Sequence, residues 1–320
     1  MRCLGLREVN RLELTVLVDN YSDLSLSDTD IVKRLRGIPP NIPLAEPGLS
    51  CLISVYEDSN EYTILFDSGI SSHCLLHNAK ALKSSMAVMS GEIGVSAEKV
   101  EAVVLSHGHF DHIGGLSGFL NSMGKDIPVI FHPGATARRR ISKPPHNPIE
   151  MSYFDEVMLQ REGGVLKKVR KPSTVASDHI LITGEVERLT SFEKGAPGLE
   201  ANISNKWIPD PFFDDQSIAV YIRGKGLVVI SGCAHAGIIN TIKHIQKVTG
   251  ISKVYGVVGG FHLTGANENN IEPTIHEMKS INPDVIVPTH CTGWRAAHEF
   301  ANEMPDQFIL NSVGSTYIFH

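Results

Sequence analysis

Three histidines and one aspartate lie within the short segment LSHGHFDHIGGL, at His107, His109, Asp111 and His112. Imidazole and carboxylate groups are ligands for zinc, iron and manganese in proteins. His107 and His109 are two residues apart and can point the same way, and the Asp-His pair that follows can serve a second ion. The spacing predicts a site for one or two transition-metal ions, with zinc first and iron or manganese as alternatives.

A strand and a helix must position this cluster. The apolar run EAVVLS (101–106) predicts a strand that ends directly before His107, and a helix is expected from about residue 113. Gly108 and Gly114 leave the backbone bare where the chain has to turn tightly. The alternative to a metal site is a set of polar side chains that ordinary hydrogen bonds satisfy at the start of a helix.

Apolar runs that predict strands alternate with segments of helical periodicity along most of the chain. The expected strands cover residues 12–19, 50–57, 62–67, 101–106, 128–132, 178–184, 217–223, 226–231, 253–258, 284–288 and 315–319. The expected helices cover residues 70–83, 113–122, 236–248, 271–280 and 294–303. This order predicts an α/β fold in which two sheets are sandwiched between layers of helices.

The stretch 135–213 interrupts this rhythm, because it is rich in proline, glycine and cations and few strands are expected within it. Between Arg138 and Lys171 there are nine Lys and Arg residues against four Asp and Glu residues. We expect an insertion within a single domain of residues 1–320. It either forms a cap that presents cations to an anionic substrate or is a solvated surface insertion.

The composition is that of a globular enzyme. The chain has 320 residues and a mass of 34.9 kDa, with 42% hydrophobic and 20% charged residues. Its formal net charge of −6 gives no global attraction to nucleic acid or to an anionic membrane, and no apolar run is long enough to span a bilayer. The five cysteines are scattered without a paired spacing. This favours a reducing compartment, so a cytoplasmic protein is expected.

The HxHxDH pattern after an apolar strand resembles the metallo-β-lactamase superfamily, and further motifs follow in the order expected of it. ILFDSG with Asp67 resembles its first motif, VVISGCAH lies where a strand ends in a metal-bridging aspartate, and VIVPTHCTG with His290 resembles its last histidine motif. LVDNYS, AEPGLS, SGCAHAGIIN, VVGGFHLTGA and PTHCTG are similar to the branch of 7,8-dihydropterin-6-ylmethyl-4-(β-D-ribofuranosyl)aminobenzene 5′-phosphate synthases. That branch commonly has a histidine where Pro47 stands in this chain.

The resemblance implies an αββα sandwich with a binuclear metal site at the strand ends between the two sheets. The ligands that it implies are His107 and His109 for one metal ion, and Asp111, His112 and His290 for the second. Asp67 would orient a ligand histidine through a hydrogen bond rather than bind metal. Its alternative role is to cap the helix that begins near residue 70.

The chain departs from the superfamily pattern at two positions. Cys233 occupies the place of the bridging aspartate, and the histidine expected before SIAVYI is missing, where PFFDDQS offers Asp214 and Asp215. We expect His235 to be the third ligand of the first metal, with Asp215 as the alternative. Cys233 is a soft ligand, a bridge between the metals or a small buried residue. Loss of the bridging carboxylate could leave the second site partly occupied.

Four further residues are candidates for substrate contacts, namely His132, His262, Thr292 and Gly293. His262 follows a strand and a pair of glycines, and we expect it to contact substrate or metal and to act with Asp111 in catalysis; its alternative role is to close a loop. Thr292 and Gly293 precede a helix whose free N–H groups could receive a phosphate. The segment WIPDPFF (207–213) offers a stacking face for a flat ring, or is an ordinary packed loop.

A dinuclear site can polarise a phosphoryl or carbonyl oxygen, activate a bound water and stabilise a departing oxyanion. Together with the resemblance, this predicts a metal-dependent hydrolase or transferase that acts on an anionic, phosphorylated pterin-type substrate, as in methanopterin-type biosynthesis. In a synthase the metals would clamp a diphosphate while an aniline nitrogen displaces it. The nucleophile, water or amine, and the oligomeric state are left open.

Two other functions stay open. The first is a metallohydrolase of a phosphoester, lactone or thioester. The second is a non-catalytic protein that binds a pterin or a metal. An iron-based oxidoreductase of the flavodiiron kind is disfavoured, because no flavodoxin-like domain follows the metal-binding one.

Overall fold

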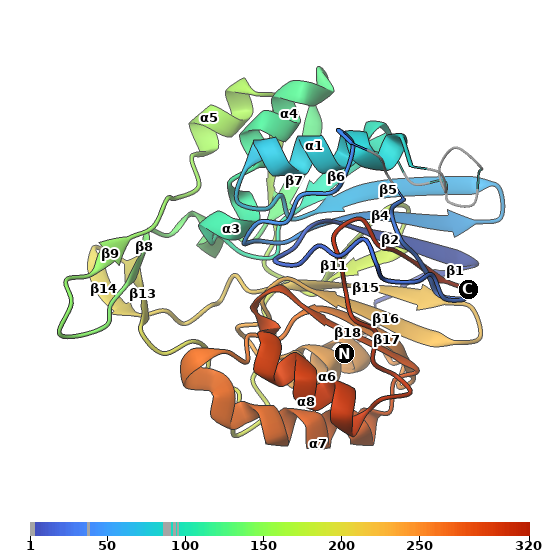
Figure 1. Ribbon diagram of the computed structural model, residues 1–320. Coiled ribbons are helices and arrows are strands. Elements are labelled where there is room, and N and C mark those ends of the chain that lie inside the picture. Colours follow the sequence, from blue (N-terminus) through green and yellow to red (C-terminus); the bar gives the residue numbers. More distant parts are fainter. Residues whose placement is uncertain (1–3, 37–38, 86–90, 92–93, 95) are drawn as a thin grey trace.

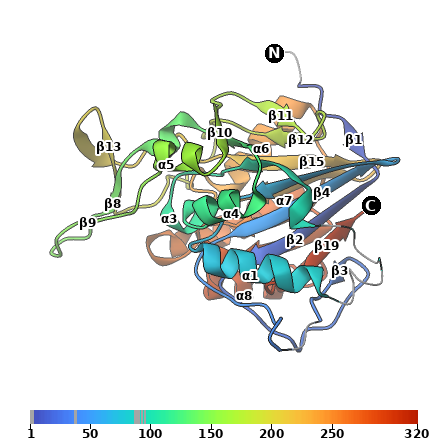
Figure 2. The same cartoon turned by 90° about the horizontal axis from the view of Figure 1, so that it is seen from above.

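Two sheets lie face to face between two layers of helices, as Figure 1 shows. The computed structural model describes residues 4–36, 39–85, 91, 94 and 96–320. The αββα sandwich is confirmed, and each strand and helix expected from the sequence has a counterpart in it. A third, small sheet projects from one end of the sandwich (Figures 1 and 2).

The larger sheet has eight strands. In spatial order they are β10 (Gly164–Lys168), β7 (Ile127–Phe131), β6 (Val100–Val104), β5 (Asn60–Phe66), β4 (Ser50–Glu57), β2 (Arg11–Val18), β19 (Thr316–Phe319) and β3 (Val32–Lys33). The helices on its outer face are α1 (Ser72–Lys83), α4 (Leu116–Met123) and α5 (Glu156–Arg161). They contact the sheet through a buried apolar cluster that includes Leu75, Phe119 and Phe131.

The smaller of the two main sheets has seven strands. They are β11 (Ser173–Val175), β12 (Ile180–Ile182), β15 (Ser217–Ile222), β16 (Gly226–Ser231), β17 (Val254–Gly260) and β18 (Val285–Thr289), with β1 (Glu8–Val9) paired to β15. The helices on its outer face are α6 (Ile238–Thr249), α7 (Ile271–Ile281) and α8 (Trp294–Glu303). Ile239, Ile275 and Phe300 belong to the buried cluster on that side.

The inner faces of the two main sheets pack against each other. Val104 of β6 and Val258 of β17 belong to the same buried cluster between the sheets. Their neighbours Val103 and Val257 point the opposite way, into the clusters under the helices. Strands that are covered on both faces read as continuous apolar runs, which explains the sequences of β6 and β17. This rigid sandwich holds the loops that follow β5, β6, β16, β17 and β18.

Residues 135–213 contribute to all three sheets. The small antiparallel sheet consists of β14 (Lys206–Pro209), β13 (Leu199–Ile203), β8 (Arg139–Ile141) and β9 (Ile149–Glu150). In contrast, β10 joins the larger main sheet, and β11 and β12 join the smaller one. The stretch expected to be a cap is therefore broader than the sheet that projects. Its strands are short and carry many charged residues, which is why few strands were expected there.

Short helical turns complete the fold. They are α3 (Phe110–Ile113), η1 (Ala97–Lys99), η2 (Pro133–Thr136), η3 (Gly265–Asn270) and η4 (His290–Thr292). Among the described residues, none of the helices is both long and apolar enough to cross a membrane.

Most of the cation excess between residues 138 and 171 is compensated by ion pairs. The pairs are Arg138 with Glu150, Arg139 with Asp210 and Asp214, Arg140 with Glu200, Lys168 with Glu156, and Arg170 with Glu185. Several of the partners come from outside this window. The positive charge of the stretch is therefore largely engaged, and its contact with an anionic substrate stays a prediction.

Candidate metal centre

A cluster of polar side chains lies where five strands of the two main sheets end. The residues are Asp67 after β5, His107, His109, Asp111 and His112 after β6, Cys233 and His235 after β16, His262 after β17 and His290 after β18. Asp67, His262 and His290 have φ values of 59°, 46° and 50°. Residues other than glycine are strained in this left-handed region, and such strain is concentrated at functional sites.

Four side chains bring their donor atoms within 4.8 Å of one another, namely Asp111, His112, Cys233 and His290. His112 Nε2 lies 3.2 Å from His290 Nε2 and 3.1 Å from Cys233 Sγ. His290 Nε2 lies 3.4 Å from Cys233 Sγ and 3.4 Å from Asp111 Oδ2. A tetrahedral zinc ion with ordinary bond lengths places neighbouring donor atoms about 3.3–3.6 Å apart. The spacing of this group, the second metal group, therefore fits one metal ion.

The first metal group consists of His107, His109 and His235. His235 Nε2 lies 3.2 Å from His109 Nδ1, again the separation expected of two ligands on one metal ion. His107 Nε2 is buried and has no hydrogen-bond partner among the described residues. The ring centroids of His107 and His235 are 4.9 Å apart. An unpaired buried imidazole nitrogen fits a metal ligand, since buried polar atoms otherwise find a hydrogen-bond partner.

Cys233 connects the two groups. Its Sγ lies within the second group, and it is also within 4.8 Å of donor atoms of His107 and His235. Burial raises the pKa of the Cys233 thiol well above its usual value, and a bound metal ion would reverse this, since a coordinated thiol is deprotonated. The geometry favours a ligand or bridge over a small buried residue, although ligation by Cys233 stays a prediction.

Asp67 forms hydrogen bonds with His112 and Ser106. Its Oδ2 accepts hydrogen bonds from His112 Nδ1 at 2.6 Å and from Ser106 Oγ at 2.6 Å, and its Oδ1 accepts one from the Ser106 N–H at 2.7 Å. Because Nδ1 of His112 is engaged in this way, its Nε2 is free to face the second metal group. The alternative role as a helix cap is wrong, because the side chain of Ser71 caps α1.

Comparisons with known proteins identify the family of this chain. Residues 47–130 match the family model of the metallo-beta-lactamase superfamily. Over 270 residues, which are 82% of this chain and 87% of the relative, the sequence is 30% identical to 7,8-dihydropterin-6-methyl-4-(beta-D-ribofuranosyl)-aminobenzene-5′-phosphate synthase of Methanocaldococcus jannaschii. The chain belongs to the metallo-β-lactamase superfamily.

Two further proteins are similar to most of this chain. An uncharacterised protein of Methanocaldococcus jannaschii is 28% identical over 270 residues, which are 84% of this chain and 92% of that protein. A crystal structure of a metal-dependent hydrolase of the β-lactamase superfamily superimposes with a TM-score of 0.72 at 23% identity, and covers 97% of this chain and 98% of that one. The metallo-β-lactamase fold expected from the motifs is thus confirmed.

Asp214 and Asp215, where the superfamily has its third histidine, lie outside the donor groups formed by the described residues. Asp215 Oδ1 is buried without a hydrogen-bond partner among those residues, so Asp215 as the third ligand of the first metal stays the alternative. Asp214 Oδ2 accepts the Gly108 N–H at 2.9 Å, and its Oδ1 accepts a hydrogen bond from Arg139 at 2.6 Å. Asp215 Oδ2 accepts the Ala236 N–H at 2.8 Å, and burial raises the pKa of Asp215 to about 7. The two adjacent carboxylates tie the loop after β6 to the loop after β16.

Two residues without an expected role hold His290. Asp19 Oδ1 accepts the His290 N–H at 2.9 Å, and Asn20 Nδ2 donates to the His290 carbonyl oxygen at 3.2 Å. Asn20 Oδ1 also lies 3.3 Å from His290 Nδ1. Both residues belong to LVDNYS, one of the segments that resemble the synthase branch, so the signal was present without an assigned role.

Burial prepares the first metal group for coordination. It lowers the pKa of His107 and His235 well below the usual value. It also lowers the pKa of His109 to about 3, with the charge of Arg139 acting in the same direction. These three imidazoles are therefore neutral near pH 7, which is the protonation state that metal ligands need.

The second metal group is more polar. Burial opposes ionisation of Asp111, but His112 and His290 hold the pKa of this carboxyl well below its usual range. Burial opposes the charge on His290 as well, but Cys291 and Asp111 raise its pKa to about 9. A metal ion that binds here must therefore displace a proton from His290, so metal affinity should depend on pH.

The structure brings His262 to the centre and leaves His132 outside it. The ring centroid of His262 lies 4.2 Å from that of His235, and a donor atom of His262 lies within 4.8 Å of Cys233 Sγ. His132 Nδ1 accepts the Gly134 N–H at 3.0 Å, and its Nε2 lies 3.0 Å from a carboxylate oxygen of Glu185. Its two nitrogens are thus used within the fold, whereas a catalytic role of His262 stays a prediction.

Thr292 is also engaged within the fold. Its side chain is 1% exposed, and its Oγ1 accepts the Phe261 N–H at 3.0 Å. This contact ties η4 to the end of β17. Gly293, with φ of 81°, is the residue before α8. Binding of a phosphate at this helix start stays a prediction. The Thr292 hydroxyl is less suited to bind it than Gly293, because this hydroxyl already accepts the Phe261 N–H.

Phe212 covers the first metal group. The sequence did not specifically predict this contact. Its ring stacks on His235 with centroids 4.3 Å apart and an angle of 12°, and meets the edge of His109 at 5.9 Å. Asp111, with its side chain 20% exposed, is the more open ligand, whereas the side chains of His112 and His290 are 0% and 4% exposed. Access to the centre is therefore from the side of Asp111.

Replacing His235 by alanine should remove metal from the first group about as severely as loss of His109. Removal of a hydrogen bond to a ligand typically costs ~10–100-fold in metal affinity, and a lost ligand should cost more. Asp215→Asn is the matched comparison, because it changes only a group that braces the loop. Competition titration against a chromophoric chelator measures both affinities. A harmless His235→Ala together with a damaging Asp215→Asn would make Asp215 the ligand.

Proposed function

We propose that this chain is a metal-dependent enzyme with a binuclear centre that acts on a phosphorylated pterin-type substrate. The observation that carries the proposal is the pair of donor groups with ligand spacing that share Cys233 at the strand ends. Zinc suits the His, Asp and Cys donors best, and iron or manganese are the alternatives. His107, His109 and His235 would hold one ion and Asp111, His112 and His290 the other, and the bound ions would supply positive charge that stabilises a phosphoryl group and its leaving oxygen.

The residues around the ligands would position the substrate and exclude water. Phe212 shields His235 and His109 from solvent on one side. Asp111 is the more exposed acid, and His262 has a buried Nδ1 without a partner among the described residues. Both are placed to hold or transfer a proton next to a bound phosphate, and we assign this role to them.

The name of the relative with 30% identity supports the choice of substrate. In a synthase of that kind, the aniline nitrogen of a ribosylated aminobenzene phosphate attacks the methylene carbon of an activated hydroxymethyl-dihydropterin. The new carbon–nitrogen bond replaces the carbon–oxygen bond to the diphosphate, which departs with its electron pair, and the amine loses a proton. A neighbouring base such as His262 could accept that proton.

Hydrolysis is the second candidate, because members of the superfamily are mostly metal-dependent hydrolases. The same centre could then direct a water molecule at a phosphoester, lactone or thioester. The two reactions differ in one requirement, the amine. Metal-loaded protein should release diphosphate from 6-hydroxymethyl-7,8-dihydropterin diphosphate only when the aminobenzene substrate is present. Release without the amine would identify a hydrolase, and binding without turnover would identify a binding protein.

The reduced pterin with a diphosphate should bind more tightly than the same pterin without it, and the difference should shrink as salt rises. The diphosphate would meet the metal ions, whose charge attracts it, and salt screens the exposed part of that attraction. Calorimetry with the two ligands at low and high ionic strength measures the difference. Equal affinity for both ligands would show that the diphosphate does not contribute to binding.

A further inference from the structure

A cavity of about 520 Å³ adjoins the metal centre, between residues 185–194 and residues 211–213. Its volume lies within the range of small-molecule sites. Phe212 belongs to its lining and also stacks on His235, so one aromatic side chain separates the cavity from the first metal group. The lining thus connects the cavity to the proposed reaction centre.

The cavity offers an exposed aromatic surface. Phe213 is 58% exposed, whereas the neighbouring Phe212 is 3% exposed. An exposed phenyl ring beside a cavity can stack with the flat ring of a ligand, and this contact does not depend on hydrogen bonds. Phe213 therefore suits an aromatic ligand.

The lining holds two cations, Arg188 and Lys194, beside three glutamates. Arg188 donates to the backbone carbonyl oxygens of His235 at 3.1 Å and Pro211 at 3.0 Å. In the described part of the chain, neither Arg188 nor Lys194 forms an ion pair, although the charge of Arg188 acts on the buried carboxyl of Asp215. A cation that forms no ion pair, next to an exposed ring, can bind an anionic aromatic ligand.

The acids of the lining are engaged elsewhere. Glu185 pairs with Arg170 at 2.9 Å, and Glu187 pairs with Lys247. Glu193 accepts the N–H groups of Ile239 and Asn240 at the start of α6, at 2.9 and 2.8 Å. None of these carboxylates forms an ion pair with Arg188 or Lys194.

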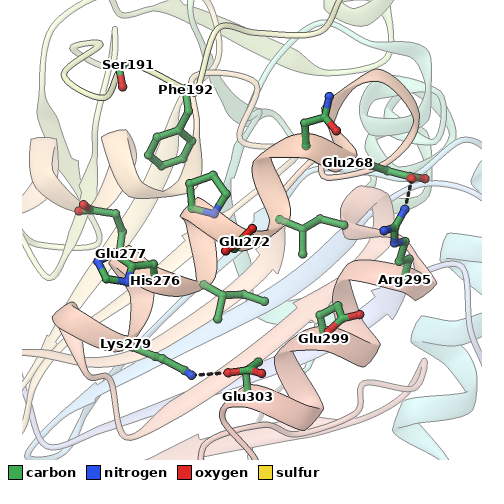
Figure 3. Close-up of a pocket in the computed structure, with 14 residues that line it drawn as sticks. Ser191, Phe192, Glu268, Glu272, His276, Glu277, Lys279, Arg295, Glu299 and Glu303 are labelled. Atoms are coloured by element: carbon green, nitrogen blue, oxygen red, sulfur yellow. Dashed lines mark hydrogen bonds and ion pairs between the residues drawn. The ribbon is translucent and has the colours of Figure 1, made fainter.

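A larger hollow of about 1010 Å³ between α7 and α8 lacks this combination (Figure 3). Its charged lining consists of Glu268, Glu272, Glu277, Glu299, Glu303, Lys279 and Arg295, with His276 beside them. Both cations are paired, Lys279 with Glu303 and Arg295 with Glu268. None of the candidate metal ligands lines it.

We propose that the cavity beside Phe212 is the subsite for an aromatic phosphate monoester, with the ring on Phe213 and the phosphate on Arg188 and Lys194. The inference rests on the proposed function and deepens it, because the second substrate of the synthase, the phosphorylated aryl riboside, has this chemistry. Because Phe212 stacks on His235, its ring would have to move before the amine of this ligand could reach the metal centre.

The test uses metal-loaded protein and two probes, 4-(β-D-ribofuranosyl)aminobenzene 5′-phosphate and the same compound without its phosphate. Calorimetry should show that Lys194→Gln weakens the phosphorylated probe by about 3- to 10-fold and leaves the other probe unchanged. Phe213→Ala should weaken both probes by about 5- to 100-fold. The matched controls are Lys253→Gln, at the opposite end of β17, and Tyr153→Ala, an exposed aromatic outside the cavity, and neither should change affinity.

The outcomes separate the subsite from the proposed function. If the Lys194→Gln and Phe213→Ala variants bind both probes as tightly as the wild-type protein does, the proposed subsite is wrong. It is also wrong if the wild-type protein binds neither probe. If the variants weaken binding as stated but no product forms from the pterin diphosphate, the subsite stands and the synthase activity does not. If product forms and neither variant changes the KM for the amine, the activity stands and the subsite is wrong.

Discussion

Loss of both His107 and His109 should empty the first metal position and abolish turnover. The wild-type protein is expected to carry about one to two equivalents of transition metal. With both residues replaced by alanine, His235 would be the remaining histidine of the first group, and a single imidazole does not hold an ion against competition from water. Affinity should fall by far more than the ~100-fold upper limit for a lost hydrogen bond to a ligand.

Elemental analysis of protein purified under identical conditions measures this loss. The matched control is His276→Ala with His298→Ala, two exposed histidines on α7 and α8, and it should retain the metal content of the wild-type protein. Full metal content in the His107→Ala, His109→Ala protein would refute the assignment of these residues as ligands.

Replacing Cys233 by alanine should have the next largest effect, because its Sγ belongs to both donor groups. We expect weaker binding of both metal ions and loss of the second ion first. Cys233→Asp would restore the carboxylate that the superfamily has at this place, so it should retain metal. Cobalt loading distinguishes the two, since a cobalt–thiolate bond gives a charge-transfer absorption that a carboxylate does not.

The wild-type cobalt protein should show the thiolate absorption, and both Cys233 variants should lack it. Cys74→Ala is the control, because this buried thiol lies on α1 and its Sγ donates to the Leu44 carbonyl oxygen at 3.3 Å. Persistence of the absorption in Cys233→Ala would assign the thiolate to another cysteine, with Cys291 as the nearest candidate.

The centre of the site could be predicted because four of its residues lie within one short segment of the sequence. His107, His109, Asp111 and His112 follow one apolar strand, and the loop after a buried strand has few ways to turn. His235 and His290 come from distant parts of the chain, and only the family resemblance linked them to the cluster. The structure then placed their Nε2 atoms 3.2 Å from His109 Nδ1 and His112 Nε2.

The supporting contacts could not be predicted, because they join residues that are far apart in the chain. Asp19 reaches His290 across 271 positions, and Asp214 reaches Gly108 across 106. A single sequence does not say which of many buried carboxylates pairs with which backbone N–H. The same limit applies to Arg139, whose charge looked available in the sequence but is bound by Asp210 and Asp214.

The strands of the main sheets followed from their apolar runs, whereas those of the small sheet did not. β8 and β14 carry arginine, lysine and tryptophan on a projecting surface, and their pairing with β9 and β13 depends on partners rather than on local pattern. Burial drives the alternation of apolar and polar residues that makes a strand recognisable. Where little is buried, as in Ile149–Glu150, that signal is missing.

Anomalous diffraction at the zinc edge, from crystals of the protein loaded with zinc, tests the central claim most directly. Two peaks about 3.5–4 Å apart are expected. One peak should lie within bonding distance of His107, His109 and His235, the other within bonding distance of Asp111, His112 and His290, and Cys233 should face both. A zinc ion bound elsewhere, with none at these strand ends, would contradict the account.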